Sequence, residues 1–170
     1  MVRRLAAAHV AAFSAIAISF SASAADAPVL GPDSNLPVPR FVSLKTEGAN
    51  GRQGPGVEHR VEWIYERAGL PLQVTAESGP WRRVRDPDGA EVWMHAQNLD
   101  HRRTAWVRGE TQARLRTQAR PGASITAYLE PGVIGTLTGC QGAYRRIALN
   151  GRVGWVEADE VWGAEDCAGL

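Results

Sequence analysis

The sequence has almost no lysine and little excess of charge of either sign. It holds 19 Lys and Arg residues against 18 Asp and Glu residues, and Lys45 is the only lysine. Without Arg3 and Arg4, which precede the first acidic residue, 17 basic residues face 18 acidic ones, a net charge of −1. Nucleic-acid binders carry a marked basic excess because phosphate neutralisation supplies much of their affinity. The near-neutral charge therefore argues against a nucleic-acid partner.

Groups arranged for catalysis are also lacking. The sequence has no phosphate-binding glycine loop, and His59, His95 and His101 show no spacing that indicates a metal site. Asp86 and Asp88 flank a tight turn, where Asp is favoured for local hydrogen bonding, so they do not indicate a glycosidase pair. We predict no catalytic residue, no metal site and no cofactor.

Long apolar runs are confined to the first 25 residues. Arg3 and Arg4 precede an uncharged, Ala-rich run over 5–20 and small residues up to Ala25, the three-part pattern of a secretory signal peptide. No later stretch approaches the roughly 18 uninterrupted apolar residues of a spanning helix. We predict a signal peptide over 1–25 that is cleaved after Ala24 or Ala25, a periplasmic or otherwise exported protein, and no membrane span after cleavage. An uncleaved anchor is the alternative.

The rest of the chain contains an internal repeat. Residues 69–84 align with residues 132–147 without a gap and match in kind along the whole stretch. The turn dipeptides that follow correspond too, and four residues beyond each glycine stands a tryptophan: Asp88-Gly89 with Trp93, and Asn150-Gly151 with Trp155. Such self-similarity indicates duplication. Each copy has only about 60 residues, a size at which domains are marginally stable and need additional staples.

Each copy is predicted to be all-β, because short β-prone runs lie between turn signals and no helical periodicity is sustained. The two turn dipeptides favour two-residue turns with positive φ at both central positions, which predicts hairpins of 81–86 with 90–95 and of 144–149 with 152–156. Further strands are predicted over 41–46, 61–66, 70–76, 105–108, 125–129 and 133–138. Strands this short protect their edges best by curling into a small barrel.

Several motifs of the first copy now identify a likeness. They are Asn50-Gly51-Arg52 with Gly54-Pro55-Gly56, Trp81-Arg82-Arg83-Val84, Asp88-Gly89 and Trp93. Together they resemble the bacterial SH3-like (SH3b) domain, and the chain is similar to small exported proteins with two such modules from bacteria with an outer membrane. The resemblance implies two tandem SH3-like barrels, module 1 over 41–105 and module 2 over 106–163. A Pro-rich leader over 26–40, expected to be disordered or extended, precedes them, and a tail over 164–170 follows.

The chain departs from the family pattern at two places. Val92-Trp93-Met94 replaces Gly-Trp-Val, and Gly51 stands where a β-branched residue is common. In the second copy, Arg114-Leu115-Arg116 is a weak version of the first motif. The first departure leaves the packing beneath the first loop undetermined by the sequence. The second makes module 1 the expected binder and module 2 a brace.

The only two cysteines are Cys140 and Cys167. In an oxidising compartment an even pair is more often a disulfide than a nucleophile. Related proteins often place a second cysteine just after the aromatic residue at Tyr144, where this chain has Arg145, so the resemblance implies that Cys167 is the substitute partner. Closing this loop would contribute on the order of 3 kcal/mol and hold the tail against module 2.

The aromatic residues are the best candidates for a ligand site, although each also suits a core. Trp63 and Tyr65 point to one face of a strand and Ile64 to the other. If Ile64 is inside, the pair is outside and forms a cleft able to hold an extended peptide. The predicted ligand-binding residues are Asn50, Arg52, Trp63, Tyr65, Trp81 and Trp93.

The resemblance implies a non-catalytic, exported binding or adaptor protein that recognises peptidoglycan peptides of the cell wall through module 1. A protein–protein interaction scaffold in an envelope complex is the alternative, so the expected partner is peptidoglycan or an envelope protein. An enzyme is a third class, disfavoured because no nucleophile, metal set or carboxylate pair is in place.

Overall fold

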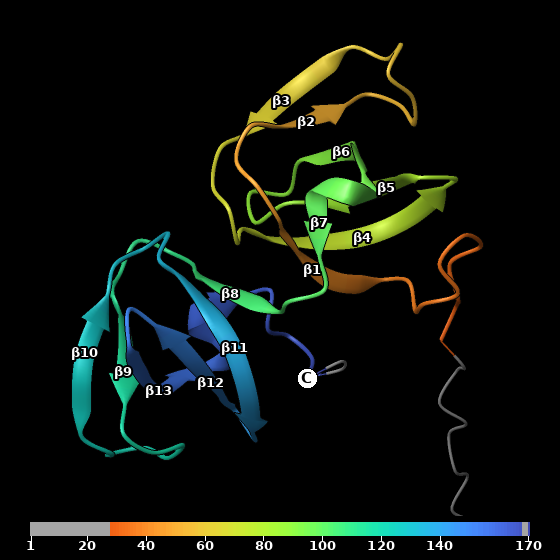
Figure 1. Cartoon of the computed structure of the whole chain (residues 1–170). Coiled ribbons are helices and arrows are strands. Elements are labelled where there is room, and N and C mark those ends of the chain that lie inside the picture. Colours follow the sequence, from red (N-terminus) through yellow and green to blue (C-terminus); the bar gives the residue numbers. More distant parts are fainter. Residues whose placement is uncertain (1–27, 168–169) are drawn as a thin grey trace, which may run out of the picture.

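The computed structural model describes residues 28–167 and Leu170, so the predicted signal peptide lies outside the described residues. It contains two seven-stranded antiparallel sheets, one above the other in Figure 1. Helical structure in the described part is limited to two short 3-10 turns, and no helix there is long and apolar enough to cross a membrane. The prediction of an all-β protein with two tandem SH3-like modules is confirmed.

The first sheet has the spatial order β3-β2-β6-β5-β4-β1-β7. Its strands are β1 (Arg40–Leu44), β2 (Ala49–Arg52), β3 (Val61–Tyr65), β4 (Pro71–Ser78), β5 (Trp81–Arg85), β6 (Glu91–His95) and β7 (Leu99–Asp100), with the 3-10 turn η1 (Ala96–Asn98) before β7. β1 pairs with both β4 and β7, and β2 pairs with both β3 and β6.

The second sheet repeats this order as β10-β9-β13-β12-β11-β8-β14. Its strands are β8 (Thr104–Val107), β9 (Ala113–Arg116), β10 (Ile125–Leu129), β11 (Ile134–Gln141), β12 (Tyr144–Leu149), β13 (Arg152–Glu157) and β14 (Val161–Trp162), with the 3-10 turn η2 (Ala158–Glu160) before β14. The register is repeated as well, since Arg52 faces Trp93 in the first sheet and Arg116 faces Trp155 in the second.

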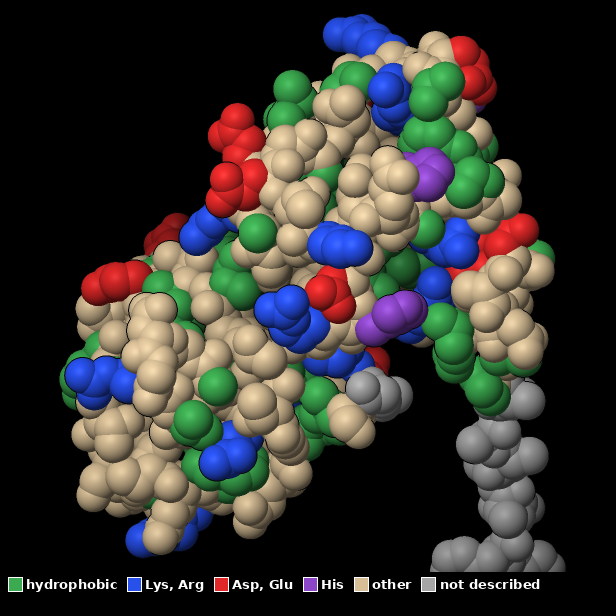
Figure 2. Space-filling model, in the orientation of Figure 1, with side chains coloured by type: hydrophobic (Ala, Val, Ile, Leu, Met, Phe, Trp, Pro, Cys, Tyr) green, Lys and Arg blue, Asp and Glu red, His purple; other side chains and the backbone are tan. Residues whose placement is uncertain are grey.

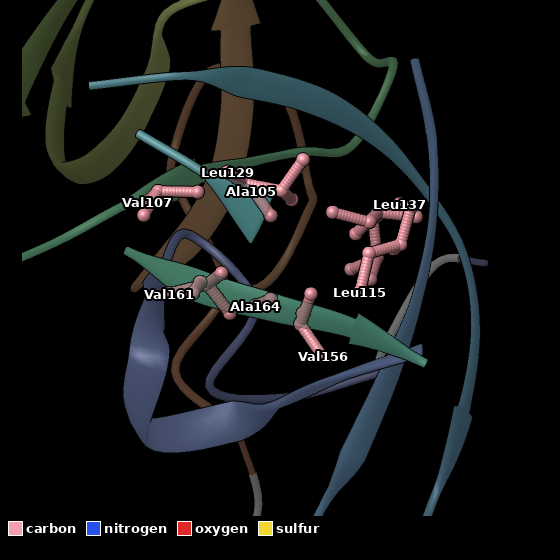
Figure 3. Packing of buried hydrophobic residues seen from close by; sticks show 10 residues of the cluster. Ala105, Val107, Leu115, Leu129, Leu137, Val156, Val161 and Ala164 are labelled. Atoms are coloured by element: carbon pink, nitrogen blue, oxygen red, sulfur yellow. The ribbon is translucent and has the colours of Figure 1, made fainter. Parts of the chain in front are cut away.

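Each sheet encloses its own apolar core. In module 2 the buried side chains converge from strands on every side of the barrel (Figure 3). Leu115, Ile147 and Val156 are almost completely buried there, as are Leu72, Val84 and Met94 in module 1. Burial of a large aliphatic side chain is worth about 1.5–3 kcal/mol, so these cores supply the main driving force for such small units.

The two central hairpins turn differently. Asn150 and Gly151 both have positive φ, 47° and 74°, which confirms the predicted two-residue turn. In the first hairpin only Gly89 has positive φ, 89°, so the prediction of the same turn is wrong. Pro87 lies in that loop, and its ring fixes φ at a negative value. The Asp86 carboxylate closes the longer loop by accepting hydrogen bonds from the N–H groups of Asp88 and Ala90.

Every predicted strand is present, with boundaries shifted by a few residues, but four strands were not predicted: β2, β9 and the two-residue strands β7 and β14. β2 and β9 contain polar or glycine residues of low β propensity, Asn50 and Gly51 in β2 and two arginines in β9. They are extended because each pairs with a strand on both sides, which satisfies their backbone groups.

The departures from the family pattern at Gly51 and Val92 compensate for each other. A Cβ on Gly51 would lie 2.7 Å from Cγ2 of Val92 and 2.9 Å from Cε2 of Tyr65, so the valine and tyrosine occupy this space. In module 2 the sizes are exchanged: Leu115 stands at the position of Gly51, and Gly154 stands at that of Val92. A Cβ on Gly154 would lie 2.6 Å from Cγ of Leu115.

The two modules are in direct contact. Phe41 of β1 and Trp162 of β14 pack edge to face with ring centroids 5.1 Å apart, and the Arg103 guanidinium lies 5.3 Å from the centre of the Phe41 ring. Thr104 donates its hydroxyl hydrogen to the carbonyl of Gly69 at 2.7 Å. Residues 101–103 connect the two sheets. The contacts above hold the modules together on either side of this short connection.

The tail is held on module 2 by two facing residues of one hairpin. Cys140 and Arg145 are partners across β11 and β12. Cys140 forms the predicted disulfide with Cys167, which is confirmed. The buried Arg145 guanidinium donates hydrogen bonds to the carbonyls of Ala164 and Glu165. Arg145 thus binds the same tail that the substitute disulfide anchors.

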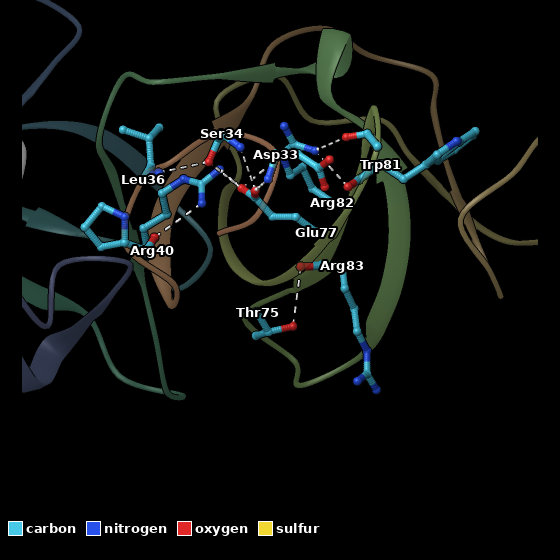
Figure 4. Close-up of polar contacts among 11 residues, drawn as sticks. Asp33, Ser34, Leu36, Arg40, Thr75, Glu77, Trp81, Arg82 and Arg83 are labelled. Carbon is cyan, nitrogen blue, oxygen red and sulfur yellow. Dashed lines mark hydrogen bonds and ion pairs between the residues drawn. The ribbon is translucent and has the colours of Figure 1, made fainter. Parts of the chain in front are cut away.

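The described part of the Pro-rich leader, residues 28–39, is folded, so the prediction of a disordered or extended segment is wrong there. It turns back on itself through hydrogen bonds between Gly31 and Leu36 and between Val38 and Val29. The Glu77 carboxylate of β4 then anchors it, as Figure 4 shows. Buried carboxylates need hydrogen-bond donors for their lone pairs, and the leader supplies them here.

Glu77 has several donors around one buried carboxylate. It accepts hydrogen bonds from the N–H groups of Asp33 and Ser34 and from the Ser34 hydroxyl, and it pairs with Arg40 at 2.8 Å and Arg82 at 3.3 Å. Burial by itself raises the pKa of Glu77, but the bonds from Ser34, Arg40 and Asp33 outweigh it and lower the pKa from 4.5 to about 2.

The charges of the two modules are mixed. On the face shown in Figure 2, basic and acidic side chains are interspersed, and no patch of one sign covers either module.

Exchanging the sizes of Gly51 and Val92 tests their complementarity. We expect Gly51→Leu to lower the stability of module 1 by about 1–3 kcal/mol through overpacking, and Val92→Gly to lower it by leaving a void. The double variant reproduces the arrangement of module 2 and should recover at least about 1 kcal/mol relative to the sum of the single effects, measured by calorimetric unfolding. Additive losses would show that the two positions are independent.

The Glu77 anchor predicts a pH-dependent leader. Because folding lowers the pKa of Glu77, its contribution is complete above about pH 4.5 and is lost as the pH falls through about 2. At neutral pH we expect Glu77→Gln to speed hydrogen exchange at the Asp33 and Ser34 amides at least about tenfold, since removing one partner of a buried ion pair is costly. Glu91→Gln, which removes a more exposed partner of Arg83 and Arg85, is the control. Unchanged exchange in Glu77→Gln would contradict the anchor.

Candidate functional site

Three of the predicted site residues come together on the outer surface of module 1. Asn50, Arg52 and Trp81 line a hollow of about 290 Å³, which we call the outer-face hollow. Its other lining residues are Gly48, Val57, His95, Gln97 and Asn98. It combines an aromatic ring, an imidazole, a guanidinium and three amide side chains.

Strand alternation places these side chains. In β2, Ala49 and Gly51 are buried, so Asn50 and Arg52 point outward. Trp81 at the start of β5 faces His95 at the end of β6, and their rings pack edge to face at 5.3 Å.

The turn η1 brings the amide side chains to the hollow. The Nδ1 atom of His95 accepts a hydrogen bond from the Gln97 N–H at 3.3 Å and so caps this turn. Gln97 and Asn98 follow within it. Their part in the hollow was not predicted, because no sequence pattern marks a 3-10 turn of three residues.

Arg52 is held by its own loop. Its Nη1 group donates to the carbonyls of Val57 at 3.0 Å and His59 at 2.7 Å, which braces the loop over 53–60. The equivalent Arg116 donates to the carbonyl of Ala123 in the second module. The arginine of this motif therefore shapes the loop beside the hollow in addition to lining the hollow.

Trp63 and Tyr65 lie elsewhere. They line a second hollow of about 410 Å³, the inter-module cleft, whose other lining residues are Ile64, Glu66, Arg67, Leu70, Asp86, Pro87, Asp88, Ala90 and Trp106. Ile64 is 61% exposed and Tyr65 only 8%, so the expectation of an inward Ile64 and an outward aromatic pair is wrong. Ile64 faces exposed Asn50 across the strands, whereas Trp63 faces buried Gly51.

Tyr65 belongs to the framework of module 1. Its hydroxyl donates to Asp86 Oδ2 at 2.9 Å, and its ring fills the space next to Gly51. Burial, the hydrogen bond to Asp86 and the nearby negative charges together raise the pKa of Tyr65 well above its ordinary value. It stays neutral and ties β3 to the turn after β5.

Trp93 is half-buried on β6 with Arg52 opposite it on one side and Arg83 on the other. Asn50, Arg52 and Trp81 share one hollow, Trp63 and Tyr65 share another, and a single cleft containing all six is not formed.

This arrangement agrees with a comparison of the sequence with known families. A family profile described as "Bacterial SH3 domain" matches residues 45–101 and again residues 109–163. The chain belongs to the bacterial SH3 domain family. Its two copies thus correspond to two bacterial SH3 domains, as the sequence motifs predicted.

Solved structures similar to this bacterial SH3 protein include two from Trichomonas vaginalis. The "Structure of NlpC1" is 15% identical, with a TM-score of 0.32, and the match covers 78% of this chain and 48% of that one. For the "Structure of NlpC2" the values are 16%, 0.33, 77% and 51%. The chain therefore spans about half the length of these structures. No curated protein matches the sequence significantly.

The two bacterial SH3 domains differ at the outer face. In module 2, Tyr144 and Glu157 face each other where module 1 has Trp81 and His95. Glu157 lies 3.4 Å from Arg116, and Glu160 of η2 lies 3.6 Å from Arg114. The equivalent surface of module 2 is thus occupied by ion pairs, whereas module 1 presents neutral amides.

Groups for metal or thiol chemistry are not assembled in the part of the chain that the structure describes. No group of three or more His, Cys, Asp or Glu side chains there has a metal-binding arrangement, and both cysteines are in the disulfide.

Proposed function

We propose that the chain is a non-catalytic, exported binding or adaptor protein that recognises the peptide stems of cell-wall peptidoglycan through module 1. Membership of the bacterial SH3 domain family supports an association with the cell wall. The outer-face hollow carries the proposal, because it gathers one aromatic ring and several polar side chains in a single open depression.

The chemistry of the hollow suits a short peptide. Side-chain amides of Asn50, Gln97 and Asn98 both donate and accept hydrogen bonds, as the backbone of an extended peptide requires. The Trp81 ring, set edge to face against His95, offers a rigid apolar surface. The positive charge of Arg52 favours a ligand with carboxylates, which peptide stems carry.

Module 2 supports the assignment of binding to module 1 alone. Its equivalent positions are joined by ion pairs, and its disulfide and Arg145 hold the tail. A ligand there would have to displace bonds that the domain already makes. Module 2 therefore acts as the brace on which module 1 is mounted.

Co-sedimentation of the exported chain with purified sacculi tests this function. We expect Trp81→Ala to weaken binding at least about tenfold, as loss of a central aromatic anchor does. Asn50→Ala should weaken it too, and this exposed residue can be changed with little risk to folding. Trp63→Ala, an exposed aromatic of the same module outside the hollow, is the control and should bind as the unchanged chain does. Failure of the unchanged chain to sediment with sacculi would refute the proposal.

A further inference from the structure

The inter-module cleft has apolar walls contributed by both modules. Trp63 and Ile64 of β3 are 55% and 61% exposed, although most large apolar side chains of the molecule are buried. Leu70 also lines the cleft, and Trp106 of β8 contributes a wall from module 2. Exposed apolar side chains that gather at one place, in contrast to scattered ones, mark interaction sites.

The cleft also has an acidic rim. Glu66 and Asp88 line it, and Glu62 of β3 lies near enough to act electrostatically on Tyr65. Within the described residues, no ion pair joins these three carboxylates to a basic side chain. The one basic residue of the cleft, Arg67, donates across the module boundary to the carbonyl of Gly132 at 2.9 Å. The carboxylates of Glu66, Asp86 and Asp88 outnumber the single guanidinium among the lining residues, so the cleft favours a positively charged group.

β3 is one of the two edge strands of the first sheet. It pairs with β2 on one side, and among the described strands none pairs with its other side. The edge of such a strand presents free backbone donors and acceptors to which an extended peptide can add as a further strand. Trp63 and Ile64, on opposite faces of β3, would then contact alternate side chains of the added strand.

Module 2 lacks this combination. Ala127 stands at the position of Trp63, and Glu130, at the position of Glu66, is hydrogen bonded to Gln112. Tyr128, at the position of Ile64, is 60% exposed, so module 2 keeps one aromatic side chain on its edge strand. The pair of tryptophans beside carboxylates is found only at the cleft between the modules, among the described hollows.

We propose that the inter-module cleft docks an extended segment of a partner protein, which pairs with β3 and presents an apolar side chain beside an arginine or lysine. The apolar side chain enters between Trp63 and Trp106, and the basic group reaches Glu66 and Asp88. A volume of about 410 Å³ suits a few side chains. Because Trp106 comes from module 2, the site needs both modules in contact. It goes beyond the peptidoglycan site, since it lies apart from the outer-face hollow and takes a ligand of opposite charge.

Two synthetic peptides test the site on the whole exported chain. The probes are acetyl-Thr-Leu-Arg-Val amide and acetyl-Thr-Leu-Glu-Val amide at millimolar concentration, observed through the indole N–H signals of the protein by NMR. We expect the arginine peptide to shift the signals of Trp63 and Trp106, and the glutamate peptide to bind about threefold to tenfold more weakly because the rim repels it.

Matched variants separate the rim from the fold. Glu66→Gln and Asp88→Asn should each lower the affinity for the arginine peptide about threefold. Glu130→Gln, at the position of module 2 that corresponds to Glu66, should leave this affinity unchanged. Trp106→Ala should lower the affinity for both peptides, because it removes the wall that module 2 contributes to the cleft.

Two results would overturn the proposal directly: no response of either indole signal to either peptide, or equal binding of the two peptides. Dependence of these signals on protein concentration without peptide would identify a second copy as the occupant. A response of Trp63 and Trp106 to purified stem peptides would make the cleft a cell-wall site. The Trp81 signal and sacculus binding report the peptidoglycan site separately, so failure of one proposal is distinguishable from failure of the other.

Discussion

Both modules depend on the pairing of their second strand with their sixth, which joins the hairpin β2–β3, or β9–β10, to the rest of the sheet. Arg52 opposite Trp93 and Arg116 opposite Trp155 are the points of closure. Both hollows of module 1 follow from this closure: β2 lines the outer-face hollow, and β3 forms a wall of the inter-module cleft. Closure requires a close approach of the backbones, and each module provides it with one glycine, Gly51 or Gly154, on opposite strands.

Duplication left the two modules with different surfaces. Module 2 satisfies its outer-face charges internally and holds its tail with the disulfide and Arg145. Module 1 keeps neutral amides at the same place and exposes Trp63 and Ile64 at its edge. Contacts such as that between Phe41 and Trp162 hold module 1 against module 2. A small barrel of marginal stability gains from such a neighbour, because interface burial adds to a core that is limited by size.

The site was predictable only where side-chain direction follows from a strand's own sequence. Trp63 and Tyr65 share a face, as strand alternation requires, but which face lies inside depends on the pairing of Asn50 with Ile64 and of Gly51 with Trp63. A shift by one residue exchanges the two faces, and no local pattern sets it. Gln97 and Asn98 reach the outer-face hollow through a short turn, and Trp106 reaches the inter-module cleft from the second module.

The sequence by itself determined the repeat, the all-β class, the strand-forming runs and the family, because these are carried by periodicity, turn chemistry and motif spacing. It also indicated the disulfide, because an exported chain with only two cysteines favours their pairing. Tertiary structure alone decided the folded leader around Glu77, the loop that Pro87 and Asp86 shape, and the exchange of sizes between Gly51 and Val92. These features join residues far apart in the chain or balance one local preference against another. Tertiary structure also decided which residues share a hollow, since strand register and the contact between the modules bring them together.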